Sequence, residues 1–160
     1  IHDELGITTL FVTHDQEEAL DLADRVVILD QGRIVQEGTP EEVCRTPNSA
    51  FVMTFLGDAN RLVGTATNGT ASIAGTRFPA DDVRDGAVEL LARPSDLGWQ
   101  TSGDGIAAKV TRVIDRPDGR RVIARTDNGE TVELDVPADT IVAAKDAGVI
   151  TVLRGSVFPV

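Results

Sequence analysis

His14 is the residue whose type and position in this sequence best suit chemistry. It follows an apolar, β-branched run at residues 8–12 and directly precedes Asp15, a favoured helix N-cap. Glu18 stands three residues after Asp15, so the pair predicts a capping box and a helix that begins beside the histidine. Ligands of open parallel sheets bind where strands end, and helix N-termini favour phosphate. These features make a phosphate contact at His14 one interpretation, but position alone favours the plainer one, a strand-end histidine that merely hydrogen-bonds a loop.

A second candidate is an anion site made of arginines that recur along two later segments. They are Arg112, Arg116, Arg120, Arg121 and Arg125. The competing interpretation is the solvated face of a sheet, on which the arginines pair with Asp115, Asp118 and Asp127. Surface ion pairs of that kind contribute little to stability and signify little about function. The sequence favours the paired face over the anion site.

Residues 8–13 and 25–30 are the elements that must position His14. Both are short and nearly continuous in apolar residues, which is the pattern of strands covered on both faces, as in parallel sheets. Residues 16–24 between them predict a helix with an inner stripe of Ala19, Leu22 and Ala23. We therefore expect a strand–helix–strand unit, which is too small to form a core by itself.

Three further elements are predicted before residue 60. The Gln31-Gly32 dipeptide predicts a tight turn between strands at residues 26–30 and 33–37. A capping box that begins at Thr39 predicts one short helix, and apolar pairs at i, i+4 predict another over residues 49–56.

From residue 60 onward the pattern changes to all-β. Turn signals lie at residues 68–69, 74–75, 85–86, 117–119 and 127–129. Alternating runs between these turns predict strands at residues 61–67, 87–92, 107–115, 120–126, 130–136 and 149–154. Short strands at this spacing are typical of a small Greek-key barrel.

The charge of the chain disfavours nucleic acid as a partner. The 160 residues carry a net charge of −11 and only 4% of them are aromatic, whereas nucleic-acid binding needs a basic surface and stacking rings. The charge is also uneven, because residues 1–60 hold 12 acidic and 3 basic side chains whereas residues 61–160 hold 14 and 12. This change places a boundary between two pieces near Asn60.

Three sequence features bear on where the chain works. No apolar stretch approaches the roughly 20 residues of a membrane span, so we expect a soluble chain whose membrane role comes through a partner. The single cysteine, Cys44, excludes an internal disulfide and suits a reducing cytoplasm. The first residue is Ile1, and residues 2–6 resemble the end of a helix, so we expect a chain cut at its N-terminus.

Residues 11–43 resemble the switch-histidine (H-loop) region of the ATP-binding subunits of ABC transporters. The resemblance starts at Phe-Val-Thr-His-Asp-Gln-Glu-Glu and continues without a gap to Glu-Gly-Thr-Pro-Glu-Glu-Val. Residues 51–60 and 89–96 resemble the transport-associated OB (TOBE) domain that follows the ATPase domain in some ABC importers. The Phe-Leu-Gly-Asp-x-Asn wording of residues 55–60 is most similar to the sulfate/thiosulfate import branch, although Ser95 stands where members often have His or Glu.

The resemblance implies an α/β remnant, the C-terminal part of a P-loop ABC ATPase domain, over residues 1–58. An all-β OB-like (TOBE) barrel would follow over residues 59–160. By the same resemblance His14 is the catalytic switch histidine that hydrogen-bonds the γ-phosphate of ATP, and no residue is assigned to a metal.

ATP and Mg²⁺ would belong to the parent protein. The phosphate-binding loop, the signature motif and the Asp-Glu pair of the family are absent from this sequence and would lie upstream of Ile1. We therefore expect this fragment alone to be inactive towards ATP.

The implied partners are a second ATPase subunit, in a homodimer, and transmembrane permease subunits at the cytoplasmic face of the membrane. A small oxyanion at the TOBE domain is a further candidate, and molybdate, a sugar or a polyamine are alternative transported solutes. The alternative function is a stand-alone TOBE-type module that senses a small oxyanion or docks a partner. Because the strands at 8–13 and 25–30 would lack neighbours, we expect residues 1–60 to exchange amide hydrogens faster than residues 61–160.

Overall fold

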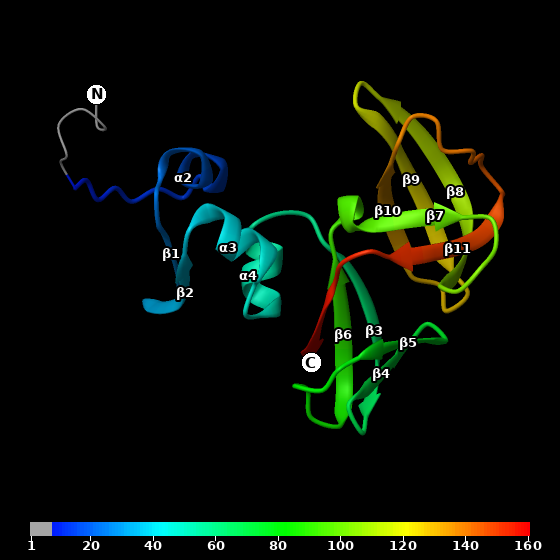
Figure 1. Ribbon diagram of the computed structural model, residues 1–160, viewed down its shortest axis with the longest axis horizontal. Helices are drawn as coiled ribbons and strands as arrows, with labels where there is room; N and C mark the ends of the chain where they lie inside the picture. The colour runs from blue at the N-terminus through cyan, green and yellow to red at the C-terminus, as the bar shows by residue number, and fades with distance from the viewer. Residues whose placement is uncertain (1–7) are drawn as a thin grey trace. The chain divides into compact units, whose positions relative to one another are not determined.

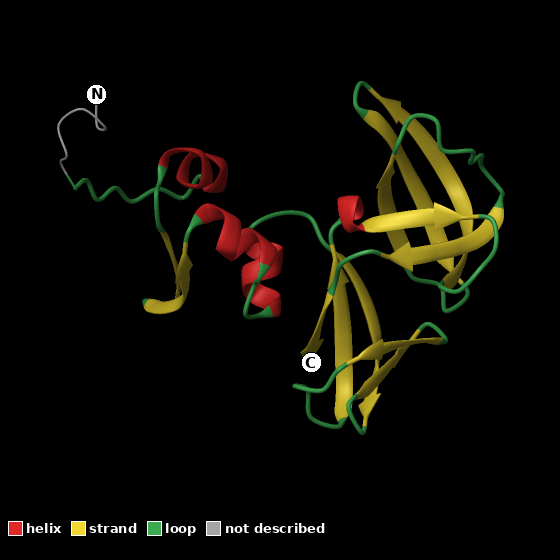
Figure 2. Cartoon of the chain, in the orientation of Figure 1, coloured by secondary structure: helices red, strands yellow, loops and turns green. Residues whose placement is uncertain are grey.

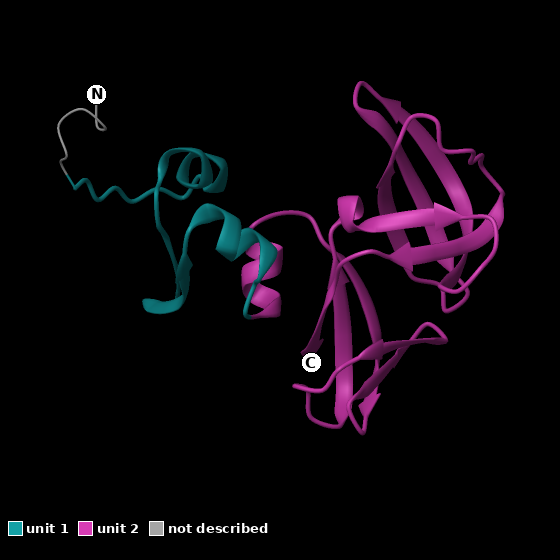
Figure 3. Ribbon diagram, viewed as in Figure 1, with its two compact units in different colours: residues 1–48 teal, residues 49–160 magenta. Residues whose placement is uncertain are grey.

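The computed structural model describes residues 8–160, and Figure 1 labels its elements. Strands make up most of its regular structure, and the helices are short (Figure 2). The chain forms two compact units, residues 1–48 and residues 49–160 (Figure 3). The domain boundary expected between residues 58 and 59 stays a prediction. The helix end expected at residues 2–6 lies outside the described residues.

Within residues 8–48, the first unit has two helices and a hairpin. Its elements are α2 (Gln16–Leu22), β1 (Val26–Asp30), β2 (Arg33–Gly38) and α3 (Pro40–Arg45). The predicted hairpin is confirmed, because β1 and β2 pair antiparallel around a two-residue turn. Gln31 and Gly32 have φ angles of +47° and +77°, as a type I′ turn requires, and this turn matches the twist of the two strands.

The predicted capping box at the start of α3 is also confirmed. The Glu42 N–H donates to Thr39 Oγ1 at 3.2 Å, and the Thr39 N–H donates to Glu42 Oε2 at 2.8 Å. These two bonds satisfy backbone donors that a helix start otherwise leaves unpaired. The hydrogen bonds from Thr39, and to a smaller extent the charge of Arg25, hold the pKa of the Glu42 carboxyl below its ordinary value.

The prediction of a strand over residues 8–13 is wrong. These residues are irregular, and Leu10 and Val12 are each 91% exposed. The predicted inner stripe of α2 is not buried either, since Leu22 is 70% exposed and no residue of α2 is buried. An apolar run becomes a strand only where a neighbouring strand completes its hydrogen bonds, and in residues 8–48 the two strands pair with each other.

The second unit contains a helix and two five-stranded sheets. The helix is α4 (Ala50–Phe55). The first sheet has the order β12-β6-β3-β4-β5, with bounds Ser156–Pro159, Gly86–Ala92, Asn60–Thr67, Thr70–Ile73 and Thr76–Pro79. The second has the order β10-β9-β8-β11-β7, with bounds Thr131–Val136, Gly119–Thr126, Ile106–Arg116, Ala147–Val152 and Leu97–Gln100. A short 3-10 helix, η1 (Pro94–Asp96), precedes β7.

All pairing in both sheets is antiparallel, and the second sheet curves into a half-barrel (Figure 2). The six strands predicted after residue 60 are confirmed as β3, β6, β8, β9, β10 and β11. The four that the sequence analysis missed, β4, β5, β7 and β12, have four residues each. Runs of four are too short for apolar alternation to stand out.

One hydrophobic core draws on inward-facing residues of both sheets. The alternation is clearest in β10, where Val132, Leu134 and Val136 are buried and the residues between them are not. Fully buried members come from the first sheet (Leu62, Ile73, Leu90) and from the second (Ile106, Leu134, Ile150). Alternation of this kind fixes the register of each strand, since a slip by one residue would turn its apolar set to solvent.

Asn60, in the central strand β3 of the first sheet, is hydrogen-bonded to β10, an edge strand of the second sheet. Its side-chain amide donates to the carbonyl oxygens of Glu133 (2.8 Å) and Ala92 (3.3 Å), and its Oδ1 accepts the Glu133 N–H at 2.7 Å. Near it the Val63 N–H donates to the Glu130 carboxylate at 2.9 Å. Side chains thereby satisfy part of the free edge of β10, which an open sheet leaves exposed.

Candidate functional site

His14 lies in a bend between residues 13 and 15, directly before α2, and its side chain is exposed. The Asp15 N–H donates to Thr13 Oγ1 at 3.0 Å, and the Asp15 carboxylate accepts the Glu18 N–H at 3.1 Å. Asp15 is thus the predicted N-cap, but Glu18 makes no return bond, so only half of the predicted capping box forms. These bonds hold the backbone on both sides of the histidine and leave its ring free.

The surface around His14 is a shallow, open hollow lined by His14, Asp15, Gln16 and Glu17. Two of these four residues carry carboxylates, which repel phosphate. The sequence contains no G-x-x-x-x-G-K-[ST] loop, and residues 8–160 hold no group of three or more His, Cys, Asp or Glu able to bind a metal ion. His14 fits the role of one hydrogen-bond donor to a nucleotide, and the described residues do not form the rest of such a site.

Two of the five predicted arginines are occupied by ion pairs. Arg120 donates to Asp115 at 2.9 Å and to the Thr140 carbonyl at 3.1 Å. Arg121 donates twice to the Asp135 carboxylate, at 2.5 and 2.6 Å, and once to Glu133 at 2.7 Å. The two hydrogen bonds to Asp135, and then the one to Glu133, raise the pKa of the Arg121 guanidinium above its ordinary value.

The acidic partners differ in part from those predicted. Asp115 is confirmed, whereas Asp118 and Asp127 make no ion pair in the described part of the chain. Asp135 and Glu133 take their place because β10 pairs with β9 in a register that sets Asp135 directly opposite Arg121. The alternation of β10 shows that Glu133 and Asp135 share one face of the strand. Which arginine they meet depends on the register between β9 and β10.

The other three arginines lack an acidic partner among residues 8–160. Within that range Arg112 and Arg116 make no side-chain hydrogen bond or ion pair, and Arg125 donates its Nε–H to the carbonyl of Gly129 at 3.1 Å. Arg112 and Arg125 lie on the face of the second sheet that points away from the core, with Ile123 directly opposite Arg112. The paired-face interpretation therefore accounts for Arg120 and Arg121, and not for these three.

The two segments that resemble the TOBE domain meet in the first sheet. Asn60 stands opposite Ala92 in the β3–β6 ladder, and a guanidinium nitrogen of Arg93 approaches Gly57 so closely that a Cβ on residue 57 would lie 2.9 Å from it. Glu89 is 7% exposed and pairs with Arg61. The sequence analysis did not assign Glu89, because a single carboxylate in an apolar strand carries no pattern.

Within the part of the chain that the structure describes, no helix is long and apolar enough to cross a membrane.

The chain is similar to curated proteins with one shared description. A sulfate/thiosulfate import ATP-binding protein of Agrobacterium fabrum is 58% identical over 161 aligned positions, which cover 100% of this chain and 47% of the relative. Its counterpart from Caulobacter vibrioides is 48% identical over 103 positions, covering 64% of this chain and 30% of the relative. That of Chromobacterium violaceum is 41% identical over 155 positions, covering 91% and 42%. The chain spans less than half the length of these relatives, and no protein-family model matches it.

Proposed function

The chain belongs to the family of sulfate/thiosulfate import ATP-binding proteins, and from that membership we propose that it forms part of the ATP-hydrolysing subunit of an ABC importer for sulfate or thiosulfate. The identity of 58% along the whole chain carries this proposal. Residues 1–58 would then be an α/β part of the ATPase domain, and residues 59–160 would be an OB-like TOBE domain. The second five-stranded sheet, which curves into a half-barrel, supports the second assignment.

In this proposal His14 hydrogen-bonds the γ-phosphate of ATP. Its exposed ring, its position before a helix start and the hydrogen bonds of its neighbours Thr13 and Asp15 support the role. ATP and Mg²⁺ supply the phosphoryl group and the charge that offsets it, in a site completed by residues outside this chain. The contribution of His14 is positioning, because phosphoryl transfer depends on the alignment of the attacking water with the phosphate.

The partners in this proposal are a second ATPase subunit and the permease subunits, on the cytoplasmic side of the membrane. The apolar side chains that unit 1 leaves exposed support the need for further protein around it. They include Leu10, Val12, Leu29 and Ile34, which are between 56% and 91% exposed. Surface of this kind, when contiguous, marks sites that another protein segment covers.

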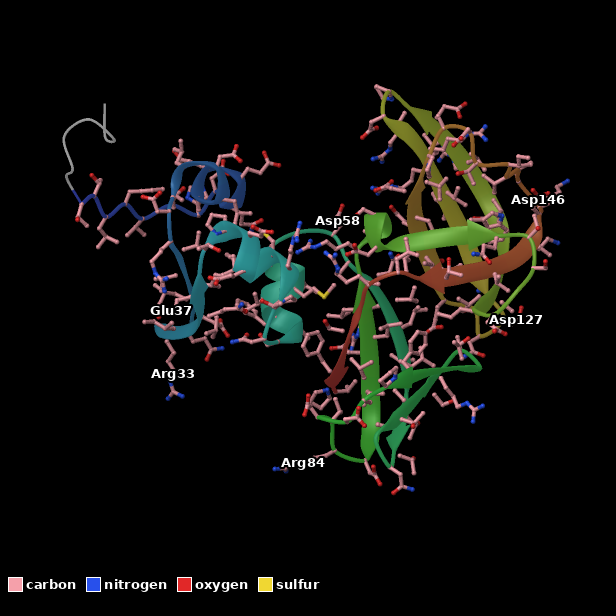
Figure 4. The ribbon with its side chains drawn as sticks, viewed as in Figure 1. Arg33, Glu37, Asp58, Arg84, Asp127 and Asp146 are labelled. Atoms are coloured by element: carbon pink, nitrogen blue, oxygen red, sulfur yellow. The ribbon has the colours of Figure 1, made fainter. Side chains whose placement is uncertain are left out.

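A chimera tests this proposal, in which this chain replaces the aligned segment of the Agrobacterium fabrum relative. We expect the chimera to hydrolyse ATP, and we expect His14→Ala to lower kcat by about a hundredfold while KM changes little, since the lost hydrogen bond acts on the reacting phosphate. Arg33→Ala is the matched control, because Arg33 is an exposed residue at the far end of the β1–β2 hairpin (Figure 4). Full activity of the His14→Ala chimera would refute the assigned role.

A second candidate function is an oxyanion-binding module, as suggested by the unpaired cations on the second sheet. It requires the 160-residue chain to bind a small oxyanion without any ATPase activity. An inactive chimera together with saturable oxyanion binding by the chain alone would favour this candidate.

A further inference from the structure

One hydrogen bond bridges the backbone across His14. The Asp15 N–H donates to Thr13 Oγ1 at 3.0 Å, and we call this bond the threonine clasp. The ring that it closes runs through the backbone of residues 13–15 and contains both the φ and the ψ angle of His14. Ser and Thr hydroxyls form such turns by accepting a nearby backbone N–H. The clasp therefore sets the direction in which the histidine side chain leaves the backbone.

Asp15 fastens the same turn to α2. Its carboxylate accepts the Glu18 N–H at 3.1 Å, and its carbonyl oxygen accepts the Ala19 N–H at 3.2 Å. Together with the clasp, these bonds hold the N–H, the carboxylate and the carbonyl of Asp15. The direction of the His14 side chain is thus set relative to the helix as well as to its neighbours in the chain.

His14 itself has no other hydrogen bond. Within residues 8–160, neither its backbone nor its ring donates to or accepts from another group. Its side chain is exposed, whereas Thr13 is half-buried. Threonine also suits the role, because branching at Cβ restricts χ1 and so holds the hydroxyl in place. The clasp is therefore the contact on which the backbone conformation of His14 depends.

We propose that Thr13 is a positioning residue for the ATP hydrolysis assigned above: through the clasp, it aims the ring of His14 at the γ-phosphate. This inference rests on the proposed function. Thr13 acts through His14 and does not contact the nucleotide. Phosphoryl transfer is sensitive to alignment, and a displacement of about 1 Å can lower a rate by about a hundredfold. Fixing φ and ψ in advance also spares the cost of ordering them when the nucleotide binds.

The chimera described above tests this role. Thr13→Val is nearly isosteric, removes the acceptor and leaves the Asp15 N–H, at an exposed position, to water. We expect kcat to fall about tenfold and KM to change by less than about twofold, because the misaligned histidine acts on the reacting phosphate. Thr13→Ser keeps the oxygen, and it should restore kcat to within about twofold of the unaltered chimera.

Two matched variants separate the clasp from other effects. Thr8→Val makes the same replacement at an exposed residue earlier in the same irregular segment, and it should leave kcat unchanged. Asp15→Asn keeps the backbone N–H and a good helix N-cap while it removes the negative charge. It should therefore keep most of the activity that Thr13→Val loses.

The relaxation of backbone ¹⁵N in the 160-residue chain follows the clasp without ATP. We expect the order parameter of the His14 amide to be about 0.8 in the unaltered chain and below about 0.6 in Thr13→Val. Thr13→Ser should retain the higher value. An order parameter at His14 that did not differ between the unaltered chain and Thr13→Val would show that the clasp does not hold the histidine, and would overturn the proposal.

The outcomes in the chimera distinguish this inference from the function on which it rests. An unaltered chimera without ATPase activity would refute the proposed function and the role of Thr13 with it. An active chimera that is impaired by His14→Ala but not by Thr13→Val would refute the role of Thr13 alone. A loss of kcat in Thr13→Val that Thr13→Ser did not restore would also overturn it, because the hydroxyl would then not be the group that acts.

Discussion

The two units use similar apolar residues with different results. Within residues 8–48, Val26, Ile28 and Val43 are the buried hydrophobic residues, whereas seven large ones are at least 42% exposed. In unit 2 a single core contains 20 buried residues, of which all but Ala80 and Val142 lie in strands of the two sheets. The apolar run at residues 8–13 forms no strand, whereas β8, which carries four charged residues, pairs with both β9 and β11. Burial therefore depends on whether the chain itself supplies the facing layer.

The largest expected difference between the units is in amide hydrogen exchange. We expect the amides of β1 and β2 to exchange through local opening of low free energy, and those of β8 and β9 to exchange only through opening of the whole second unit. The protection factors should then differ by several orders of magnitude, since about 1.4 kcal/mol changes an equilibrium tenfold. Equal protection of β1 and β8 in a monomeric sample would contradict this comparison.

A pair of leucine-to-alanine substitutions gives the next largest contrast. Leu62 is fully buried in the core of unit 2, so Leu62→Ala should lower the free energy of unfolding by about 2–5 kcal/mol. Leu29 in β1 is 56% exposed, so Leu29→Ala should change it by no more than about 0.5 kcal/mol. Urea unfolding followed by the fluorescence of Trp99, the only tryptophan, measures Leu62→Ala in unit 2, and the same titration followed by the amide signals of β1 in ¹⁵N–¹H spectra measures Leu29→Ala in unit 1. A cost at Leu29 that matched the cost at Leu62 would show that unit 1 has a core of its own.

The sequence predicted the second unit better than the first, for a physical reason. Turn residues with positive φ, such as Asn68-Gly69 and Ala74-Gly75, are local signals, and they sit in the two-residue turns that follow β3 and β4. The apolar run at residues 8–13 predicted a strand from local sequence alone, and these residues form none. The ion pairs of Arg121 depend on the register between β9 and β10, which no local pattern specifies.

The candidate sites show the same limit. His14 and its cap, Asp15, could be read from the sequence because both functions are local. The bulge at Thr111 in β8 could not be read from the sequence. Alternation along β8 predicts which face each side chain lies on only where no extra residue interrupts the pairing. The position of Lys145 depends on the hydrogen bond from its N–H to the carbonyl of Val110, which lies 35 positions earlier in the chain. Features assembled across strands are therefore visible only in the fold.

Substitution of Asn60 should have an effect on stability of intermediate size, confined to unit 2. Asn60→Ala would leave the N–H and carbonyl of Glu133 without their partner at the edge of β10, and we expect a loss of about 1–3 kcal/mol in the free energy of unfolding. Asn60→Asp is the informative companion, because it keeps the acceptor for the Glu133 N–H and removes the donor. It should fall between Asn60→Ala and the unaltered chain in urea unfolding. A neutral Asn60→Ala would mean that the edge strand β10 does not need this connection to β3.

The smallest expected effect is a dependence of unit 1 on pH through Glu42. The pKa of this carboxyl is lower in the folded chain than its ordinary value of 4.5, chiefly because of the hydrogen bonds with Thr39. Its stabilising contribution is therefore complete above pH 4.5 and is lost as the pH falls through the lower, folded pKa. The Thr39 amide, which donates to the Glu42 carboxylate, should shift in ¹⁵N–¹H spectra over that acidic range.

Glu42→Gln should abolish this titration, whereas Arg25→Gln should leave most of it, since the charge of Arg25 contributes less than the hydrogen bonds. A Thr39 amide that titrated identically in the Glu42→Gln variant would show that another group controls the start of α3. Because Thr39 and Glu42 are three residues apart, their capping box needs no facing layer. If the capping box persists in the weakly packed unit 1, it shows stability that the local sequence supplies by itself. The burial seen in unit 2 depends instead on neighbouring layers.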